Sequence, residues 1–539
     1  MTDYELCPHR NAIFNRCAGA MRLVLLATCA LWCFPHIARS QTQSVDYVQP
    51  INWSRYDGMF GVKPGDTFGQ SLVSVLQNQS RYELNWVPTQ YEVGDNAANY
   101  AGVPYYWAYT NFNTYGYEGS IRPLSSFAYG TATLLATGTY SPSAAGVTYA
   151  EALNRTEIAI RGVAFGHRSN TQTDPRQFGG RGTSSTTWQA GYWAAHAAEA
   201  AWMLWDQLTL ETRTAVANMV VYEANSYMTY TVPYWKKPDG TTNFSGDTKA
   251  EENAWNSQLP ALAQAMMPDH PNVTAWRTKA SELQVSSYSV QSDNTSTRLV
   301  DDQQVKAWIN GFNAFPDGVV VNHSRVHPDY MVSSYTQTIN VVNESLAGQY
   351  IPESTVFNID KVYHALTELQ FTSGTDSKYS TGKSILAPGG TIYQRTVDGG
   401  YTASIYYPQG NDWTYQVTDS YLNTDLIAEW LGLDEGKNFD VMGWAQARVD
   451  AMIALQNRPG HNGNIYQAGD WLTSGRGADE DLYRSNAAAW LQWWLMDNGQ
   501  MSPIAGQWGA IPVAEPSSLA LVGLAAGTFA IAGWHKRRR

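Results

Sequence analysis

The stretch "TTWQAGYWAAHAAEAAWMLWDQL" covers residues 186–208 and decides the fold of this chain. It is rich in alanine and tryptophan, and as a helix it would be apolar on most of its faces. A helix that is hydrophobic all round is typical of the interior of a large protein, where other helices cover it. The stretch therefore predicts a helical core in which this segment is buried.

A second helix is expected directly after this stretch. "TLETRTAVANMVVYEANSYM" begins with Thr209, which suits an N-cap, and has Glu211 in its first turn. The two segments predict a helical hairpin, and residues 247–267 and 272–289 predict the next pair. Further helices are expected near residues 124–137, 149–165, 335–347, 354–372, 419–430, 440–456 and 481–498.

This run of helical hairpins predicts an all-α dominated fold. Without a fixed repeat period, it favours an α/α toroid, an incomplete or closed barrel of helical hairpins, over an α-solenoid. Residues 390–413 alternate like strands around Asp398-Gly399-Gly400 and predict a small β-hairpin insertion, and residues 290–322 mix strand and loop. No Pro- or Ser-rich linker interrupts residues 45–507, so we expect one toroid domain there.

The first 40 residues are expected to be a secretory signal peptide. Arg22 supplies positive charge, an apolar run follows, and Ala38-Arg39-Ser40 suits cleavage by a signal peptidase. A buried N-terminal helix is the alternative. All four cysteines lie before this cleavage point, so the mature protein is expected to have no disulfide and no thiol nucleophile.

Residues 512–539 form a second sorting element. Val513-Ala514-Glu515-Pro516 precedes an apolar run and a basic end of Lys536 and three arginines. This tail resembles the PEP-CTERM sorting signal of Gram-negative bacteria, although the first proline of the usual motif is missing. The resemblance implies processing by an exosortase-like membrane protease and export to the cell surface or the medium. The apolar run is expected to be a short transmembrane segment within this signal, and a plain C-terminal membrane anchor is the alternative.

Charge and composition limit the partners of the remaining chain. Residues 41–509 contain 27 basic and 44 acidic side chains, which gives a net charge of −17. Such an acidic chain is not expected to bind nucleic acid. The 21 tryptophans and 33 tyrosines are a hint of sugar binding, because their flat rings with polar edges suit carbohydrates.

The segment "NHSRVHPDYM", residues 322–331, concentrates the chemistry. Pro328 disfavours helix at His327, so the segment is expected in a loop or at a strand end, where functional sites usually lie. Its amide, imidazole, guanidinium and phenol side chains are the groups that proton abstraction beside a carboxylate needs. In β-elimination from a uronic acid, an amide or guanidinium stabilises the developing negative charge, and His or Tyr transfers protons.

These residues resemble the site of polysaccharide lyases with α/α-toroid folds, such as alginate and glucuronan lyases. In some alginate lyases an Asn and a His are adjacent, as Asn322-His323 are here, and Tyr330 and Arg325 match the other two roles. The resemblance spans residues 188–413 and implies catalysis by these four residues on an anionic polysaccharide, without a cofactor. The β-sandwich domain of many such lyases has no room here.

Other stretches predict the walls of a substrate cleft. A Gly-rich basic stretch with Arg181 leads to Trp188 and Gln189, and the segment "TKAEENAWN" offers Asn253 as an amide for a carboxylate. The segment "YYPQGNDW" adds Tyr407 and Asn411, and His327 is expected to bind substrate or orient its neighbours. Each stretch also suits an ordinary loop or a solvated helix face.

Three alternatives remain open. A metal site at His323 and His327 would need a third ligand such as Asp329. A glycoside hydrolase on the same scaffold would need two facing carboxylates from among Asp247, Glu251, Asp329 and Asp412. A non-catalytic surface protein would use its aromatic residues for sugar binding alone.

Overall fold

The computed structural model describes residues 43–94, 102–109, 118–170, 177–184, 186–412, 418–460, 463, 465 and 478–505. The chain divides into two compact units, Met1–Gln43 and Ser44–Arg539, and the fold below is that of the second. The expected signal peptide of residues 1–40, the sorting element of residues 512–539 and Trp413 lie outside the described residues. No helix among the described residues is long and apolar enough to cross a membrane.

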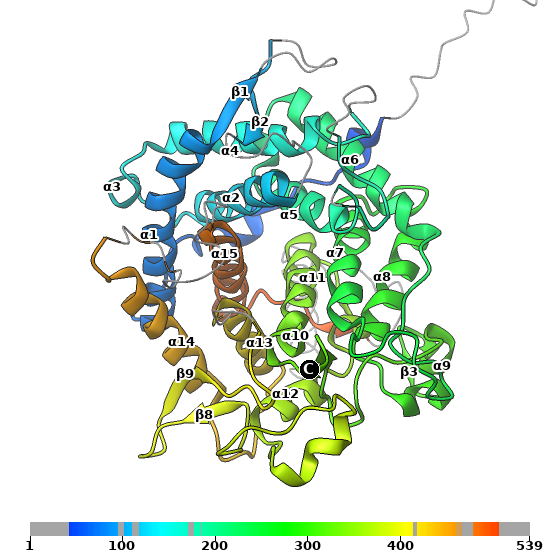
Figure 1. Cartoon of the computed structure of the whole chain (residues 1–539). Helices are drawn as coiled ribbons and strands as arrows, with labels where there is room; N and C mark the ends of the chain where they lie inside the picture. The colour runs from blue at the N-terminus through cyan, green and yellow to red at the C-terminus, as the bar shows by residue number, and fades with distance from the viewer. Residues whose placement is uncertain are drawn as a thin grey trace, which may run out of the picture. The chain divides into compact units, whose positions relative to one another are not determined.

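Helices dominate the described part of the chain, which confirms the all-α expectation (Figure 1). Their bounds are α1 (Thr67–Gln90), α2 (Glu118–Ala136), α3 (Pro142–Ala145), α4 (Tyr149–Phe165), α5 (Ala190–Met203), α6 (Leu210–Met228), α7 (Ala250–Met266), α8 (Val273–Ser287), α9 (Val305–Trp308), α10 (Pro328–Met331), α11 (Tyr335–Ala347), α12 (Ile359–Thr367), α13 (Thr418–Trp430), α14 (Val441–Gln456) and α15 (Ala478–Asp497).

Six of these helices contact one another in a closed series. Helix α2 packs on α5, α5 on α7, α7 on α11, α11 on α13, α13 on α15, and α15 returns to α2. Helix α5 is buried along its whole length, and α13 is buried over most of its length. Helices α1, α4, α6, α8 and α14 pack against members of this series and lie nearer the edge of the view in Figure 1.

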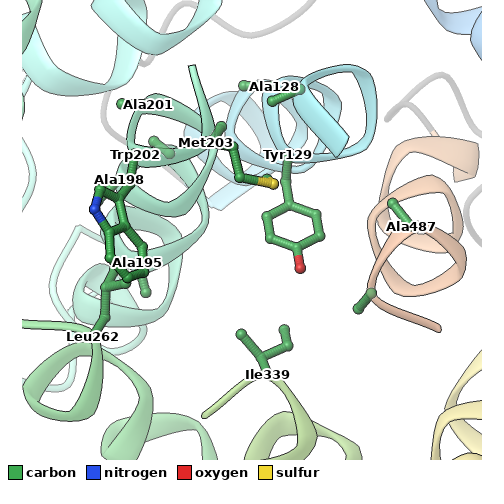
Figure 2. Close-up of a cluster of buried hydrophobic side chains, with 14 of the residues drawn as sticks. Ala128, Tyr129, Ala195, Ala198, Ala201, Trp202, Met203, Leu262, Ile339 and Ala487 are labelled. Atoms are coloured by element: carbon green, nitrogen blue, oxygen red, sulfur yellow. The ribbon is translucent and has the colours of Figure 1, made fainter. Parts of the chain in front are cut away.

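Small side chains explain why α5 lies at the centre. Its alanines leave room for close approach of neighbouring helices, and each methyl group still contributes apolar surface. Figure 2 shows Ala195 and Ala198 of α5 beside Tyr129 of α2, with Ile339 of α11 and Ala487 of α15 facing the same space. The alanine-rich sequence of residues 186–208 is thus the part of the chain that several helices share as a packing surface.

Caps fix the ends of the predicted helices. The side chain of Thr209 accepts a hydrogen bond from the backbone of Thr212, as predicted for the start of α6. Asp440 caps α14 in the same way, accepting from the backbone of Met442. The observed α4 and α11 have the predicted bounds, 149–165 and 335–347.

One helix prediction was wrong in its extent, and one helix was missed. The helix expected over residues 354–372 is broken at Asn358, whose φ of 58° is left-handed, so that α12 begins only at Ile359. The Asn358 side chain donates to the Tyr288 carbonyl and to Asp293, at 2.9 Å each, which holds the break. Helix α1 was not predicted, because polar residues separate the apolar side chains that it buries.

The sheets formed by the described residues are all two-stranded. Antiparallel pairs form between β1 and β2, β3 and β4, β5 and β6, and β8 and β9, and β7 pairs in parallel with β10. The β8–β9 pair confirms the hairpin predicted around residues 398–400. The strands are β1 (Tyr91–Gly94), β2 (Tyr105–Tyr109), β3 (Leu299–Val300), β4 (Gln303–Gln304), β5 (Val321–Asn322), β6 (Arg325–Val326), β7 (Ile351–Pro352), β8 (Tyr393–Arg395), β9 (Tyr401–Ile405) and β10 (Ile504–Ala505).

Candidate active site

The β5–β6 hairpin places the Asn-His pair. Asn322 pairs with Arg325, so His323 and Ser324 alone form the turn, with φ angles of 50° and 56°. A two-residue hairpin turn of this kind needs positive φ at both positions, which costs a residue other than glycine about 1–2 kcal/mol. Hydrogen bonds hold the turn: the Ser324 amide donates to the Gly246 carbonyl at 2.9 Å, and the His323 amide donates to Asn322 Oδ1 at 2.7 Å. Such local strain is common at functional sites.

A hydrogen-bonded series of three side chains begins at this turn. His323 Nδ1 lies 2.9 Å from Asp412 Oδ2, and His323 Nε2 lies 3.2 Å from the Tyr330 hydroxyl. The second oxygen of Asp412 lies 3.1 Å from His327 Nε2. With the Nδ1 proton directed at Asp412, the Nε2 atom of His323 can accept the proton of the phenol. We call Tyr330, His323 and Asp412 the relay.

Burial and charge set the protonation states around the relay. Burial lowers the pKa of His327 to about 4, so this ring is neutral near pH 7. Burial alone would raise the pKa of Asp412, but His327, His323 and Arg325 lower it below its ordinary value. Because His327 is neutral near pH 7, it supports the carboxylate there as a hydrogen-bond donor rather than as a cation.

A pocket of about 650 Å³ opens beside the relay. His323 and Tyr330 border it, and so does Asn322. The aromatic side chains along its walls are Trp188, Tyr230, Phe244 and Trp255. The rings of Trp188 and Trp255 meet edge to face with centroids 5.5 Å apart. This combination of flat apolar walls and converging polar groups is typical of small-molecule and sugar sites.

Arg181 brings a fixed positive charge to the pocket. Its guanidinium forms an ion pair with Glu223, donates to Asn256 Oδ1 at 3.3 Å and stacks over the Tyr227 ring at 4.0 Å. His167 Nε2 lies 2.8 Å from Glu223 on the other side. Burial favours the neutral acid, but the Arg181 charge, together with His167 and the Gly180 amide, outweighs it and lowers the pKa of Glu223 to about 2. We call Arg181, Glu223 and His167 the buried cluster.

The pocket also holds a carboxyl group that stays protonated near neutral pH. Burial raises the pKa of Glu251 to about 8, and the negative charges of Glu252 and Asp247 add to the effect. The Asn322 amide donates to Glu251 Oε2 over a long 3.5 Å. Lys249 pairs with both acidic neighbours, at 2.9 Å from Asp247 and 3.2 Å from Glu252, and offsets one of their two negative charges.

Five of the predicted site residues border the pocket, namely Arg181, Trp188, Asn322, His323 and Tyr330. Arg325 lies outside this set and donates to the Gly410 carbonyl at 3.2 Å, with its second nitrogen 3.7 Å from Asp412. His327 is buried beside the relay. Asn411 adjoins Asp412 in the chain but is not one of the pocket residues.

Three further predicted substrate-binding residues are not among the residues that line the pocket. Gln189 is buried where α5 begins. Asn253 is buried on α7 and donates to the Pro233 carbonyl at 3.0 Å. The Tyr407 hydroxyl donates to Asp329 Oδ1 at 2.9 Å.

Asp329 does not complete the histidine pair. Tyr407 and Tyr421 each donate to its Oδ1 atom at 2.9 Å, and burial raises its pKa to about 7. Asp412 is the carboxylate beside His323 and His327 instead. The sequence offered no local signal for this pairing, because Asp412 lies 89 residues after His323.

Sequence reasoning also missed the pocket roles of Tyr230, Phe244, Lys249 and Trp255. They come from α7 and from the segment between α6 and α7, which only the fold brings opposite the β5–β6 turn. Comparison with family models, with curated proteins and with solved structures found no match for this chain.

Proposed function

We propose that this chain is an exported polysaccharide lyase that cleaves a uronic-acid polymer by β-elimination. The observation that carries the proposal is the relay, whose histidine and phenol border the pocket together with Asn322. Asn322 and Arg181 supply the amide and guanidinium that a developing negative charge on the uronate requires. Arg181 takes the cationic role that the sequence suggested for Arg325, which lies behind Asp412.

The relay suggests how protons move in this reaction. His323 accepts the phenol proton at Nε2, while Asp412 stabilises the charge that the imidazole gains. The Tyr330 phenolate removes the proton from C5, the bond between C4 and the glycosidic oxygen breaks, and a C4–C5 double bond forms. The phenol then protonates the departing oxygen, and His323 returns its proton to Tyr330. His327, with a fully buried side chain, positions Asp412 in this scheme.

The remaining pocket residues support binding of a uronate sugar. The aromatic walls suit the apolar faces of a sugar ring. The protonated Glu251 adds no negative charge beside Asn322, and it can donate a hydrogen bond to a substrate carboxylate. Lys249 offsets the charges of Asp247 and Glu252, which reduces repulsion of an anionic polymer.

The closed series of helices supports a finer proposal for the fold, an α/α toroid. Helices α2, α5, α7, α11, α13 and α15 would form the inner ring, and α1, α4, α6, α8, α12 and α14 the outer one. The β5–β6 turn and the segment between α6 and α7 reach the pocket from different parts of this series. An experimental structure tests this arrangement.

The decisive experiment is incubation of the purified chain with alginate, glucuronan and related uronate polymers. A lyase creates unsaturated sugar ends that absorb ultraviolet light. We expect this absorbance for the natural sequence and for His364→Ala, whose exposed ring pairs with Glu368 away from the pocket. We expect little of it for Tyr330→Phe. Equal rates for the Tyr330 variant and the natural sequence would contradict the proposal.

A glycoside hydrolase is the second candidate, favoured by Glu251. A carboxyl group whose pKa is raised to about 8 is suited to protonate a leaving glycosidic oxygen, and Asp247 and Glu252 are nearby carboxylates. A hydrolase would release reducing ends without ultraviolet absorbance, and Glu251→Gln would abolish that release. A sugar-binding protein without activity would bind the polymer and produce neither signal.

Export remains part of the proposal and rests on the sequence alone. Residues 1–40 are proposed as a signal peptide and residues 512–539 as a PEP-CTERM-like sorting element. Sequencing the N-terminus of the mature protein should place it near Gln41. A mature protein that retains Cys29 and Cys33 would contradict export by this route.

A further inference from the structure

We propose that His323, His327 and Asp412 bind a divalent transition metal ion such as Zn²⁺, and that the bound ion blocks the relay. The ligand atoms are His323 Nδ1, His327 Nε2 and a carboxylate oxygen of Asp412, which lie within 4.8 Å of one another. Binding of the ion follows from these three side chains alone. Only the blocking effect rests on the proposed function.

The types and spacing of these atoms suit zinc. Imidazole nitrogens and carboxylate oxygens are ordinary zinc ligands, at about 2.0–2.2 Å from the ion. Around a tetrahedral ion such ligands lie roughly 3.3 Å from one another. The two histidine nitrogens lie 2.9 and 3.1 Å from the oxygens of Asp412. Small side-chain movements would therefore let an ion replace the two hydrogen bonds that join His323 and His327 to Asp412.

The three side chains are held before any ion arrives. His323 stands on the left-handed turn between β5 and β6, and His327 directly precedes the proline that begins α10. The two rings meet edge to face with centroids 5.4 Å apart. The Tyr330 ring packs against both, with centroids 5.2 Å from His323 and 4.6 Å from His327. A site assembled in advance binds with less loss of conformational freedom.

The outer contacts also resemble those that tune metal sites. A ligating histidine commonly directs its second ring nitrogen at a polar group, which fixes the tautomer. The Tyr330 hydroxyl occupies that position, 3.2 Å from His323 Nε2. Because the protein offers three ligands, a fourth position remains for water or another ligand, as in catalytic zinc sites. His323 borders the pocket and gives the ion a route to solvent.

Arg325 opposes the ion and sets its affinity. One guanidinium nitrogen lies 3.7 Å from Asp412 Oδ2, so its charge repels a cation and competes for the carboxylate. The other nitrogen is held by the Gly410 carbonyl at 3.2 Å. Removing this charge should therefore tighten zinc binding, which a merely adventitious surface ion would not do.

A bound ion would interrupt the relay by chemistry at His323. With Nδ1 bound to zinc, the imidazole proton resides on Nε2 and points at the Tyr330 oxygen. Nε2 then donates to the phenol and no longer accepts its proton. Asp412, bound to the same ion, no longer stabilises a positive charge on the ring. Zinc is thus expected to inhibit the lyase reaction reversibly.

Calorimetric titration of the purified, chelator-treated chain with ZnCl₂ tests the site, using protein without a histidine tag. We expect one ion per chain, at least tenfold weaker binding for His327→Ala and for Asp412→Asn, and several-fold tighter binding for Arg325→Ala. His364→Ala is the matched control and should bind like the natural sequence, because its ring pairs with Glu368 elsewhere. Ca²⁺, which prefers oxygen ligands, should not reproduce the titration.

Zinc binding that is equal in the natural sequence and in His327→Ala would overturn the site, as would no binding at all. These outcomes do not depend on any polysaccharide being cleaved. If the chain cleaves a uronate polymer, zinc should inhibit it and a chelator should restore the rate. Unchanged cleavage with the site loaded would overturn the blocking effect while leaving the site itself intact.

Discussion

The buried cluster and the relay use the same residue types in opposite settings. Each joins a carboxylate to a histidine, and an arginine lies beside each carboxylate: Arg181 in the buried cluster, and Arg325 next to Asp412 of the relay. The Glu223 side chain is 0% exposed and that of His167 is 0% exposed, whereas Asp412 and His323 are 29% and 42% exposed. In the buried cluster the ion pair fixes the shape of the pocket wall at Arg181, because its buried groups have few other conformations. In the relay, solvent can reach the groups to which we assign proton transfer.

The comparison teaches that an ion pair's role depends on its surroundings more than on its composition. A buried pair must keep both members, because each alone would be an uncompensated charge. An open pair loses little stability when one member is removed, because water replaces the partner.

The largest effect is expected for Glu223→Gln in the buried cluster. The substitution keeps the shape of the side chain but leaves Arg181 without its counter-charge, so we expect a loss of about 3 kcal/mol in the free energy of unfolding. Asp412→Asn is the matched control and should cost less than about 1 kcal/mol, because its pairs are partly exposed. Urea unfolding at pH 7 measures both. Equal losses would remove the distinction between the two clusters.

For turnover, unlike stability, we expect the large effects beside the relay rather than in the buried cluster. In the proposed lyase reaction Asn322 and Tyr330 act on the reacting sugar, so Asn322→Ala and Tyr330→Phe should each lower kcat by about 10²–10³-fold while the chain stays folded. Rates on the most reactive uronate polymer, with circular dichroism as the folding check, decide the matter. If both variants keep near-normal rates, this pocket is not the catalytic centre.

The pH dependence of stability distinguishes Glu223, which has an arginine ion pair, from the buried Glu199, which accepts a hydrogen bond from the Asn343 amide at 2.6 Å. Burial raises the pKa of Glu199 to about 8, whereas the Arg181 partner lowers that of Glu223 to about 2. For Glu199 the folded state holds its proton more tightly, so stability is fully present below pH 4.5 and falls as the pH rises toward 8. For Glu223 stability is fully present above pH 4.5 and falls as the pH drops toward 2.

Each carboxyl contributes a slope on the order of 1.4 kcal/mol per pH unit inside its own window. Glu199→Gln should remove the downward slope between pH 4.5 and 8, and Glu223→Gln the upward slope between pH 2 and 4.5. Unfolding free energies measured across this range test both. If the slopes of the two variants resemble each other, the arginine partner is not what separates the two sites.

Local pattern was enough to predict much of the fold. The helical hairpin of α5 and α6 follows from an alanine-rich buried stretch and a threonine cap, both of which act over a few residues. Helix α1 escaped because its buried side chains, among them Leu72 and Leu76, are spaced among glutamines, asparagines and serines. The break at Asn358 was not predicted, because its cause is a contact with Asp293, which lies 65 residues away in the sequence.

Each part of the candidate site was predictable only from its own stretch of sequence, as for Arg181 and Trp188 in one stretch and the Asn-His pair in another. Asn322, His323 and Tyr330 stand within nine residues and border one pocket. Asp412 reaches them through the loop after the β8–β9 hairpin, and Glu223 reaches Arg181 from the middle of α6. Such pairings depend on how distant elements pack, which a pattern along the sequence does not encode.

The smallest effect is expected for Arg325→Ala, which separates substrate binding from positioning. Arg325 touches the Gly410 carbonyl and lies 3.7 Å from Asp412, but it does not border the pocket. Its removal should leave KM unchanged, because no contact with substrate is lost, and lower kcat a few-fold, because Asp412 loses a neighbouring charge that helps to hold its carboxylate in place. Arg325→Lys keeps the charge and should recover most of the rate. A large rise in KM with unchanged kcat would instead make Arg325 a residue that binds the substrate carboxylate, and the relay would then meet its substrate on the side of Gly410 rather than in the pocket beside Trp188.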